Sequence, residues 1–506
     1  MGQRLIQGRR AAADEMGEHL PLLLSRQIGA GGGRGEEKLR RVAGLAGHCR
    51  FVLGRSATTP PNVSSASSSG KNQLIRRLPD HDLPMGGRPR LLYAARMPLP
   101  RRAPGFLHPR ASYPLAGIVS AVAGFTILCA GAFAQPTPRW DGAPTAVVTP
   151  IGGPQTVFDP KTDACDGHDV PDAPARAFRG ADGGVVMFGM HYVNRALRGP
   201  TLDALKLDCK VVLASGGKDD PAAYDDYSWI TATWTDDGVH VAALVHHEYH
   251  ANEHKGRCAF PDMMRCWTNS ILVARSSDAG SSFTRPDGSP VLATYPFPQD
   301  VGQGRHRGFF NPSNIVSDGE WKYMFAATTG WTGQRYGACL FRTRTPSDPR
   351  SWLAWDGRAF AARTGDPYAG DADPTKTCEP IAPFVTPVGA IVRHRPSGAW
   401  IAVMMASKND SFFTEPGFWA TASRDLIHWS KPTLVMSGAT LYDDPCKAGS
   451  RLIAYPSLLD PAATTRNFED AGDDAMLYYV SMRVDGCSIT SDRTLLRRRV
   501  KLSVLD

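Results

Sequence analysis

The sequence predicts an all-β protein, and within that class a five-bladed β-propeller over residues 161–506. Two observations support this prediction. Short runs of apolar, β-branched and aromatic residues follow one another along this part of the chain, and turns containing Gly and Asp join them in pairs. Almost no segment shows the 3.6-residue apolar period of an amphipathic helix.

The turns that join these runs recur at the spacing expected of propeller blades. In chain order they read GADGG, TDDG, SDGE, RPSG and AGDD, and they contain Asp182, Asp237, Asp318, Ser397 and Asp473. Each lies between two strand-like runs, such as SWITATW and VHVAALV, which is the signal of a hairpin. Hairpins repeated in this way indicate small antiparallel sheets arranged around an axis. A β-sandwich with long loops is the alternative.

A second type of turn, RSSDAGSSF, places an Asp, a Gly and an aromatic ring at short intervals. The Asp278 carboxylate can cap backbone amides, Gly280 can take a positive φ, and Phe283 can anchor the turn to a sheet. Two degenerate relatives, TPSDPRSW and SRDLIHW, contain Asp348 and Asp425. We expect these turns to be structural and to lie on the side of the propeller away from any active site.

Residues 1–134 differ in composition from the rest of the chain. They contain 19 Lys and Arg against 7 Asp and Glu, whereas residues 135–506 contain 38 against 42, out of totals of 57 and 49. The net positive charge therefore belongs to the N-terminal part, and we expect no nucleic-acid partner for the folded part. Residues 1–96 are Gly- and Ser-rich in places and lack a persistent apolar period, which indicates a disordered or mis-assigned extension.

Residues 97–134 have the layout of a secretory signal peptide. Basic residues precede an apolar run, and Ala132 and Ala134 supply the small residues of a cleavage site. An uncleaved membrane anchor is the alternative, because the apolar run approaches a spanning length. In either case we expect an exported domain, secreted or periplasmic, that follows a linker at residues 135–160. Contact with a membrane is expected only if the signal segment is retained.

Cysteine usage agrees with export. Eight cysteines follow the signal segment, and an even number in an exported chain indicates disulfides. They are Cys165, Cys209, Cys258, Cys266, Cys339, Cys378, Cys446 and Cys487. Cys258 and Cys266 flank a short loop, CAFPDMMRC, and are the expected local pair. Zinc is the competing interpretation, but the sequence contains no C-x-x-C spacing.

The rhythm of strands and turns resembles that of known glycosidase propellers. The Asp278 turn resembles the Asp box of sialidases, and SRDLIHW resembles its counterpart in five-bladed arabinanase-, β-xylosidase- and invertase-type glycosidases. The combination of ALVHHEYH, a Cys-containing loop and an Asp box is also similar to an uncharacterised group of exported bacterial proteins. The resemblance covers about residues 160–500 and implies a fold, and its turns name no substrate.

In a propeller, the starts of the innermost strands and the ends of the second strands share one face. Carboxylates, His, Trp and Arg gather at these positions, and a sugar-binding pocket needs this composition. Aromatic rings stack on sugar rings, and polar groups bond hydroxyls. The expected substrate-binding residues are His168, Arg176, His191, Trp229, His246, His250, Asn311, Trp331, Arg335 and Tyr455.

A glycoside hydrolase needs two carboxyl groups, one on each side of the scissile bond. The five-bladed glycosidases carry an Asp at the first blade, another at the second and a Glu as general acid at the third. Asp172 and Asp226 match the first two places, but Asn311 stands where the Glu is expected. Glu248 or Glu379 would have to replace it. We expect Asp172 as base or nucleophile and Glu248 as the acid, whose pKa must then be raised.

The segment HHEYHANEH allows other interpretations. It lacks the H-E-x-x-H spacing of a metalloprotease. On a strand, His246, Glu248 and His250 would share one face, which would suit a divalent metal, although we otherwise expect no cofactor. The histidines with Tyr249 would suit a polysaccharide lyase, and a non-catalytic glycan-binding propeller is a further alternative. In each case we expect a monomer whose partner is an oligo- or polysaccharide.

Overall fold

The computed structural model describes residue 140 and residues 142–409 and 411–506. The predicted extension and signal segment, residues 1–134, lie outside the described residues. The predicted linker at residues 135–160 is wrong for most of its length, because Thr145–Phe158 forms the long strand β1. In the part of the chain that the structure describes, no helix is long and apolar enough to cross a membrane.

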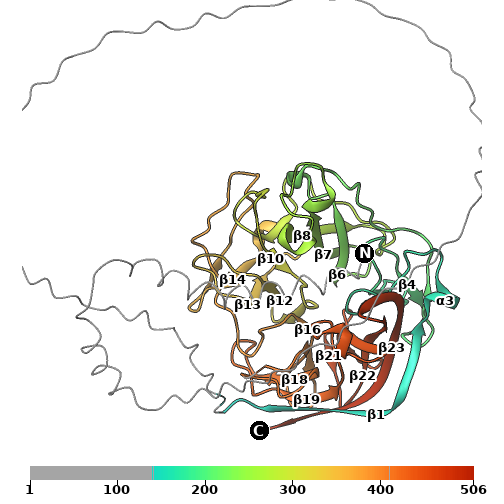
Figure 1. Cartoon of the computed structure of the whole chain (residues 1–506). Helices are drawn as coiled ribbons and strands as arrows, with labels where there is room; N and C mark the ends of the chain where they lie inside the picture. The colour runs from blue at the N-terminus through green and yellow to red at the C-terminus, as the bar shows by residue number, and fades with distance from the viewer. Residues whose placement is uncertain (1–139, 141, 410) are drawn as a thin grey trace, which may run out of the picture. The chain divides into compact units, whose positions relative to one another are not determined.

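The described chain is almost entirely β, as predicted, and its strands form five consecutive antiparallel groups (Figure 1). The first group contains β2 (Arg176–Arg179), β3 (Val185–Phe188), β4 (Leu197–Gly199) and β5 (Lys206–Leu207). The second contains β6 (Tyr227–Trp234), β7 (Val241–His250), β8 (Trp267–Ser276) and β9 (Val291–Thr294). The third contains β10 (Arg307–Phe310), β11 (Val316–Asp318), β12 (Trp321–Thr328), β13 (Gly337–Thr343), β14 (Leu353–Trp355) and β15 (Phe360–Ala362).

The fourth group contains β16 (Val388–His394), β17 (Trp400–Ala406), β18 (Gly417–Ser423) and β19 (Thr433–Ser437). The fifth contains β20 (Arg451–Leu459), β22 (Asp474–Asp485), β23 (Ser488–Leu505) and β1. Parallel pairing of β8 with β10 joins the second and third groups, and β21 (Asp470–Ala471) pairs with β16. The helical pieces are α3 (Pro160–Asp163), η2 (Pro221–Ala223), η3 (Ala251–Glu253), η4 (Met263–Arg265), η5 (Pro349–Ser351) and η6 (Pro445–Lys447).

The first and last described strands lie side by side. β1 pairs antiparallel with β23, from Thr145 opposite Leu505 to Phe158 opposite Leu495 (Figure 1). The fifth group is therefore built from both ends of the described chain. Every other antiparallel group uses consecutive residues, so this pairing supplies the longest sequence separation in the fold.

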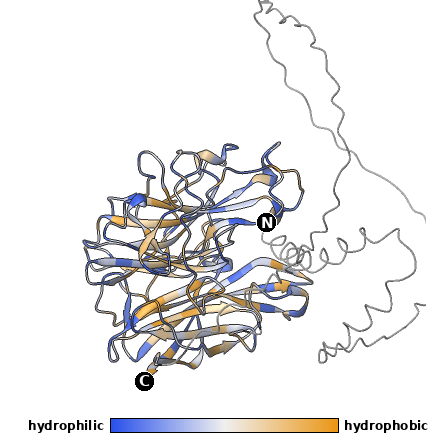
Figure 2. Cartoon of the chain, turned by 90° about the vertical axis from the view of Figure 1, so that its left-hand side faces the viewer, coloured by the Kyte–Doolittle hydropathy of each residue, from blue (hydrophilic) through white to orange (hydrophobic). Residues whose placement is uncertain are grey.

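Apolar side chains fill the spaces between neighbouring groups. Separate buried clusters join the first group to the second, the second to the third, and the third to the fourth, and the largest joins the fourth, fifth and first. Every residue of β7, β17 and β18 is buried, so these strands do not show the alternation of a sheet with one wet face. Figure 2 shows hydrophobic segments along many of the strands.

The RSSDAGSSF turn forms as the sequence predicts. The Asp278 carboxylate accepts hydrogen bonds from the backbone N–H groups of Ser281 (3.1 Å) and Ser282 (2.8 Å). Gly280 has a φ of +74°, and a Cβ there would lie 3.2 Å from the ring of Phe178 in β2. The ring of Phe283 is buried, 5.8 Å from that of Phe188 in β3. The turn therefore ties the second group to the first.

All eight cysteines of the folded part are paired, and the predicted Cys258–Cys266 disulfide is confirmed. The other disulfides are Cys165–Cys209, Cys339–Cys378 and Cys446–Cys487. Cys339 lies in β13 and is joined to a loop, whereas Cys165–Cys209 joins two loop residues and Cys446–Cys487 joins η6 to the turn between β22 and β23.

The contacts of Asp278 predict that Asp278→Ala destabilises the protein by about 1–2 kcal/mol, because several N–H groups lose a charged acceptor. Denaturant titration would measure the change in unfolding free energy. Asp287→Ala is the matched control, since Asp287 is exposed on the same loop. Equal stability of the two variants would contradict a structural role for the turn.

Candidate active site

The groups surround one pocket with a volume of about 660 Å³. All five contribute to its lining. The first group supplies Asp172 and His191, the second Trp229, His246, Glu248 and His250, the third Phe310 and Asn311, the fourth Met405, and the fifth Tyr455 and Arg493. Residues far apart in sequence therefore meet in a single space.

The alternation of β7 decides which of its residues reach the pocket. His246, Glu248 and His250 line it, as predicted for residues two apart on a strand. His247 and Tyr249 point to the other side of the sheet and line a much smaller cavity. On β6, Trp229 pairs with His246 and Tyr227 with Glu248, which adds two rings to the same face.

Glu248 is buried between two imidazoles. His246 Nε2 lies 3.1 Å from Glu248 Oε1, and His250 Nε2 lies 2.8 Å from Oε2. Burial alone would raise the pKa of Glu248, but the hydrogen bonds and positive charges of the two histidines outweigh it and hold the pKa well below its ordinary value. The expectation of a raised pKa for Glu248 is therefore wrong, because both imidazoles favour the carboxylate form.

Asp172 is held by three side chains on its side of the pocket. Arg493 forms an ion pair with it, the Tyr455 hydroxyl donates to it at 3.1 Å, and His191 Nε2 lies 3.5 Å away. Its backbone N–H donates to the carbonyl of Gly189, just after β3. Sequence reasoning missed Arg493, because Asp172, its partner in the pocket, lies 321 residues earlier in the chain.

The two carboxylates face the same space. Both Asp172 and Glu248 interact electrostatically with His191 and with Tyr455. Burial is the main cause that lowers the pKa of His191, so this imidazole is neutral at pH 7. Burial and the negative charge of Asp172 raise the pKa of Tyr455, which therefore stays a hydrogen-bond donor.

Aromatic rings cover one side of the pocket. Tyr192 lies 4.7 Å from Tyr227 and 5.8 Å from Trp229, measured between ring centroids. His191 packs against Tyr192 and Trp229. Such a wall can bind the apolar face of a sugar ring, while the carboxylates and Arg493 can bond its hydroxyls.

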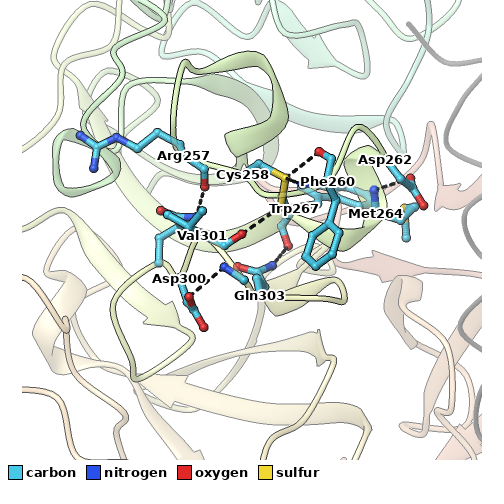
Figure 3. The surroundings of a disulfide bond; sticks show 12 residues. Arg257, Cys258, Phe260, Asp262, Met264, Trp267, Asp300, Val301 and Gln303 are labelled. Carbon is cyan, nitrogen blue, oxygen red and sulfur yellow. Dashed lines mark hydrogen bonds between the residues drawn. A yellow bond between two sulfur atoms is a disulfide. The ribbon is translucent and has the colours of Figure 1, made fainter.

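The Cys258–Cys266 loop contributes to the pocket lining, and Figure 3 shows the surroundings of its disulfide. Its residues Pro261 and Met263 line the pocket, together with Trp267 at the start of β8. The amide of Gln303 donates to the Trp267 carbonyl at 2.8 Å, and Ala259 N–H donates to the Val301 carbonyl at 2.9 Å. The disulfide and the loop that contains Val301 and Gln303 thus hold Trp267 in its place in the pocket wall.

Two lining residues have a left-handed backbone without being glycine. Asn311 has a φ of +48° and Tyr455 a φ of +57°. For a residue with a Cβ this region costs roughly 1–2 kcal/mol, and such strain persists only where surrounding contacts hold it. Asn311 Oδ1 lies 2.7 Å from His246 Nδ1, and Tyr455 bonds Asp172, so each strained residue supports one of the two carboxylates.

Asp226, a predicted catalytic residue, does not line the pocket. Its carboxylate accepts hydrogen bonds from the His250 N–H (3.0 Å) and from His254 Nε2 (2.9 Å). It therefore anchors the segment that follows β7. Glu379 is half exposed and forms an ion pair with Arg335, so neither of these predicted residues reaches the pocket.

Four predicted binding residues, His168, Arg176, Trp331 and Arg335, also lie elsewhere, and the Arg335 guanidinium is half exposed beside Glu379. His168 is exposed outside the pocket. Trp331 is buried in the apolar cluster between the second and third groups, where its indole N–H donates to the Pro374 carbonyl. Arg176 is 2% exposed and bonds backbone carbonyls. The strand pattern does not reveal where loops and strand ends turn away from the pocket, as at His168, Trp331 and Arg335, or that Arg176 is buried among the strand groups.

The aspartate-containing turns lie at the ends of strands that point away from the pocket. β8 begins at Trp267, which lines the pocket, and the Asp278 turn follows its last residue, Ser276. The Asp425 turn likewise follows β18, whose residue Phe418 pairs with the pocket-lining Met405 near the opposite end. Asp348 follows the end of β13 in the same way.

Within the described residues, no group of three or more His, Cys, Asp and Glu side chains is arranged to hold a metal ion. His246 and His250 each direct a ring nitrogen at one oxygen of Glu248.

His250 predicts a specific pH dependence of stability. Burial would lower its pKa, but its contacts with Glu248 and Glu253 raise the pKa to about 9 from the ordinary 6.5. Because the pKa of His250 is higher in the folded state, the protonated imidazole stabilises the fold fully below pH 6.5. This stabilisation is lost as pH rises to about 9. Between these two pH values the unfolding free energy of the wild-type protein should fall as pH rises. In His250→Gln this slope should be smaller, by up to about 1.4 kcal/mol per pH unit. Denaturant titrations at several pH values would measure this slope.

His428→Gln, at an exposed site, is the control and should keep the wild-type slope. Equal slopes for the wild type and both variants would contradict the raised pKa of His250.

No protein-family model and no curated protein matches the chain. Among solved structures, a thermostable family-43 glycoside hydrolase aligns with a TM-score of 0.37 and 11% identity over 66% of this chain and 93% of its own. An α-L-arabinofuranosidase from Podospora anserina aligns with a TM-score of 0.38 and 11% identity over 71% and 97%. The catalytic domain of a Coprinopsis cinerea GH62 α-L-arabinofuranosidase aligns with a TM-score of 0.36 and 10% identity over 71% and 97%.

Proposed function

We propose that the protein is an exported glycoside hydrolase with a five-bladed propeller fold, each strand group being one blade. One observation carries the proposal: two carboxylates, the partly buried Asp172 and the buried Glu248, come from different groups and line one aromatic-lined pocket. Hydrolysis of a glycosidic bond needs such a pair, and the rings suit the apolar faces of sugars.

In this proposal Asp172 is the base or nucleophile. Arg493 forms an ion pair with it, and the Tyr455 hydroxyl donates a hydrogen bond to it. An ionised carboxylate can either attack the anomeric carbon or remove a proton from the attacking water.

Glu248 supplies the acid together with its two imidazoles. Its own low pKa excludes a permanently protonated carboxyl, but His250 has a pKa raised to about 9 and carries a proton at neutral pH. A proton can pass from the imidazolium to Glu248 and then to the oxygen of the leaving group, as the glycosidic bond breaks. The acid is thus the Glu248–histidine cluster rather than the carboxyl alone, and the site as a unit keeps one carboxylate charged and one proton available.

The lyase alternative loses its proposed tyrosine. Tyr249 points away from the pocket, and its hydroxyl donates to the Asp219 carbonyl at 2.7 Å.

Four disulfides support export, because such bonds persist in oxidising compartments. A neutral to acidic folded part also supports a carbohydrate rather than a nucleic-acid partner, and a monomer stays the expectation.

The test is product analysis on a panel of plant, microbial and uronic-acid polysaccharides. We expect new reducing ends without the absorbance of an unsaturated uronate, and loss of about 10²–10⁴-fold in rate for Asp172→Asn and for Glu248→Gln. Glu379→Gln is the matched control, since Glu379 is a carboxylate outside the pocket, and it should keep wild-type activity.

Three outcomes would overturn the proposal. Unsaturated uronate products would indicate a lyase, and retention of a glycan without any product would indicate a binding protein. Full activity of both amide variants, with the variants shown to be folded by thermal melting, would place the chemistry elsewhere.

A further inference from the structure

Arg176 occupies a position that no other side chain in the described part of the chain shares. It is 2% exposed, and its guanidinium contacts all five strand groups. It donates to the carbonyl oxygens of Thr231 (2.7 Å), Gly389 (2.7 Å), Pro312 (3.4 Å) and Ala175 (3.5 Å) and to the hydroxyl of Ser457 (3.2 Å). We propose that Arg176 is a positioning residue that holds both carboxylates of the site in register. The inference rests on the proposed function.

The first connection runs through the third group to Glu248. The Pro312 carbonyl bonds Arg176, and Pro312 directly follows Asn311. Asn311 has the left-handed backbone described above, and its side chain and N–H meet Nδ1 of His246 at 2.7 and 3.2 Å. His246 in turn contacts Glu248 at 3.1 Å. A shift of the Pro312 carbonyl would therefore move the imidazole that fixes one oxygen of Glu248.

The second connection runs through the fifth group to Asp172. Ser457 accepts from Arg176 and donates to the Ala175 carbonyl at 2.7 Å. It lies two residues after Tyr455, across an irregularity in β20 between Ala454 and Ser457. Tyr455 is the other strained lining residue, and its hydroxyl bonds Asp172. The same guanidinium thus fixes the segment that presents the Tyr455 hydroxyl.

The chemistry of the position favours Arg over other residues. Its acceptors are carbonyl and hydroxyl oxygens from five directions, and a planar guanidinium offers five N–H donors in a fixed fork. Lys has three donors on one nitrogen and cannot reach the same set. Gly389 has no room for a Cβ, which would lie 2.3 Å from the Pro456 carbonyl, so the fourth and fifth groups are already in close contact there. Loss of the guanidinium would remove a donor from the carbonyls of Thr231, Gly389 and Pro312.

The test compares Arg176→Lys with Arg195→Lys. Arg195 is a matched control because it is also buried, but it pairs with Asp166 and Asp169 and does not line the pocket. Both changes should lower stability. Only Arg176→Lys should lower kcat per folded molecule, by roughly 10–100-fold with a smaller change in KM, because misplaced catalytic groups weaken the transition state more than substrate binding.

A readout without turnover separates this inference from the proposed function. Nitrogen NMR of the imidazoles should show changed ring-nitrogen shifts for His246 in Arg176→Lys and unchanged shifts in Arg195→Lys. If the His246 shifts change but the wild-type protein hydrolyses no glycan, the positioning role is supported and the proposed glycoside hydrolase function is overturned. Unchanged shifts, or equal kcat values for the two folded variants, would overturn the positioning role.

If Arg176→Lys does not fold, Ser457→Ala tests the second connection alone. It should lower kcat by roughly tenfold through Tyr455 and Asp172 while leaving the His246 shifts unchanged. Wild-type kcat in this variant would contradict the inference.

Discussion

The guanidinium of Arg176 is the contact on which the arrangement of the strand groups depends. Carbonyl oxygens from neighbouring groups converge on this guanidinium, and burial prevents water from satisfying them. The Arg176 guanidinium, with five N–H donors, supplies the hydrogen bonds that these buried carbonyls need. Burial lowers the pKa of Arg176 to about 9, which leaves it charged at neutral pH. The apolar clusters hold each group to its neighbour, whereas Arg176 holds all of them to one point.

The pocket above this contact is defined by paired charges. Asp172 with Arg493 and Glu248 with its histidines are each stabilised as ions, because an unpaired charge at such burial would be costly. The pairing also separates the roles of the two carboxylates. One is fixed beside a permanent cation, and the other is fixed beside groups that exchange protons. Because the two carboxylates have different neighbours, one site can supply both a base and an acid.

Local chemistry explains what could be predicted from the sequence. The Asp278 turn, the Cys258–Cys266 pair and the alternation of His246, Glu248 and His250 along β7 each depend on residues a few positions apart. The errors involve contacts between distant segments. Asp226 has the composition of a catalytic residue, but its position beneath His250 depends on how the chain continues after β7. Arg493 is one of several arginines in β23, and only its place beside Asp172 distinguishes it from the others.

The assignment of Asp172 and Glu248 as the catalytic pair can be tested most directly by chemical rescue with azide. Asp172→Ala and Glu248→Ala would be incubated with sodium azide and the glycan that the wild-type protein degrades, and mass spectrometry would identify the products. Azide can attack the anomeric carbon from the space that the missing carboxylate leaves, so at least one of these variants should form a glycosyl azide that Glu379→Ala does not form. Wild-type turnover in both variants, or the absence of any glycosyl azide from either folded variant, would contradict the account.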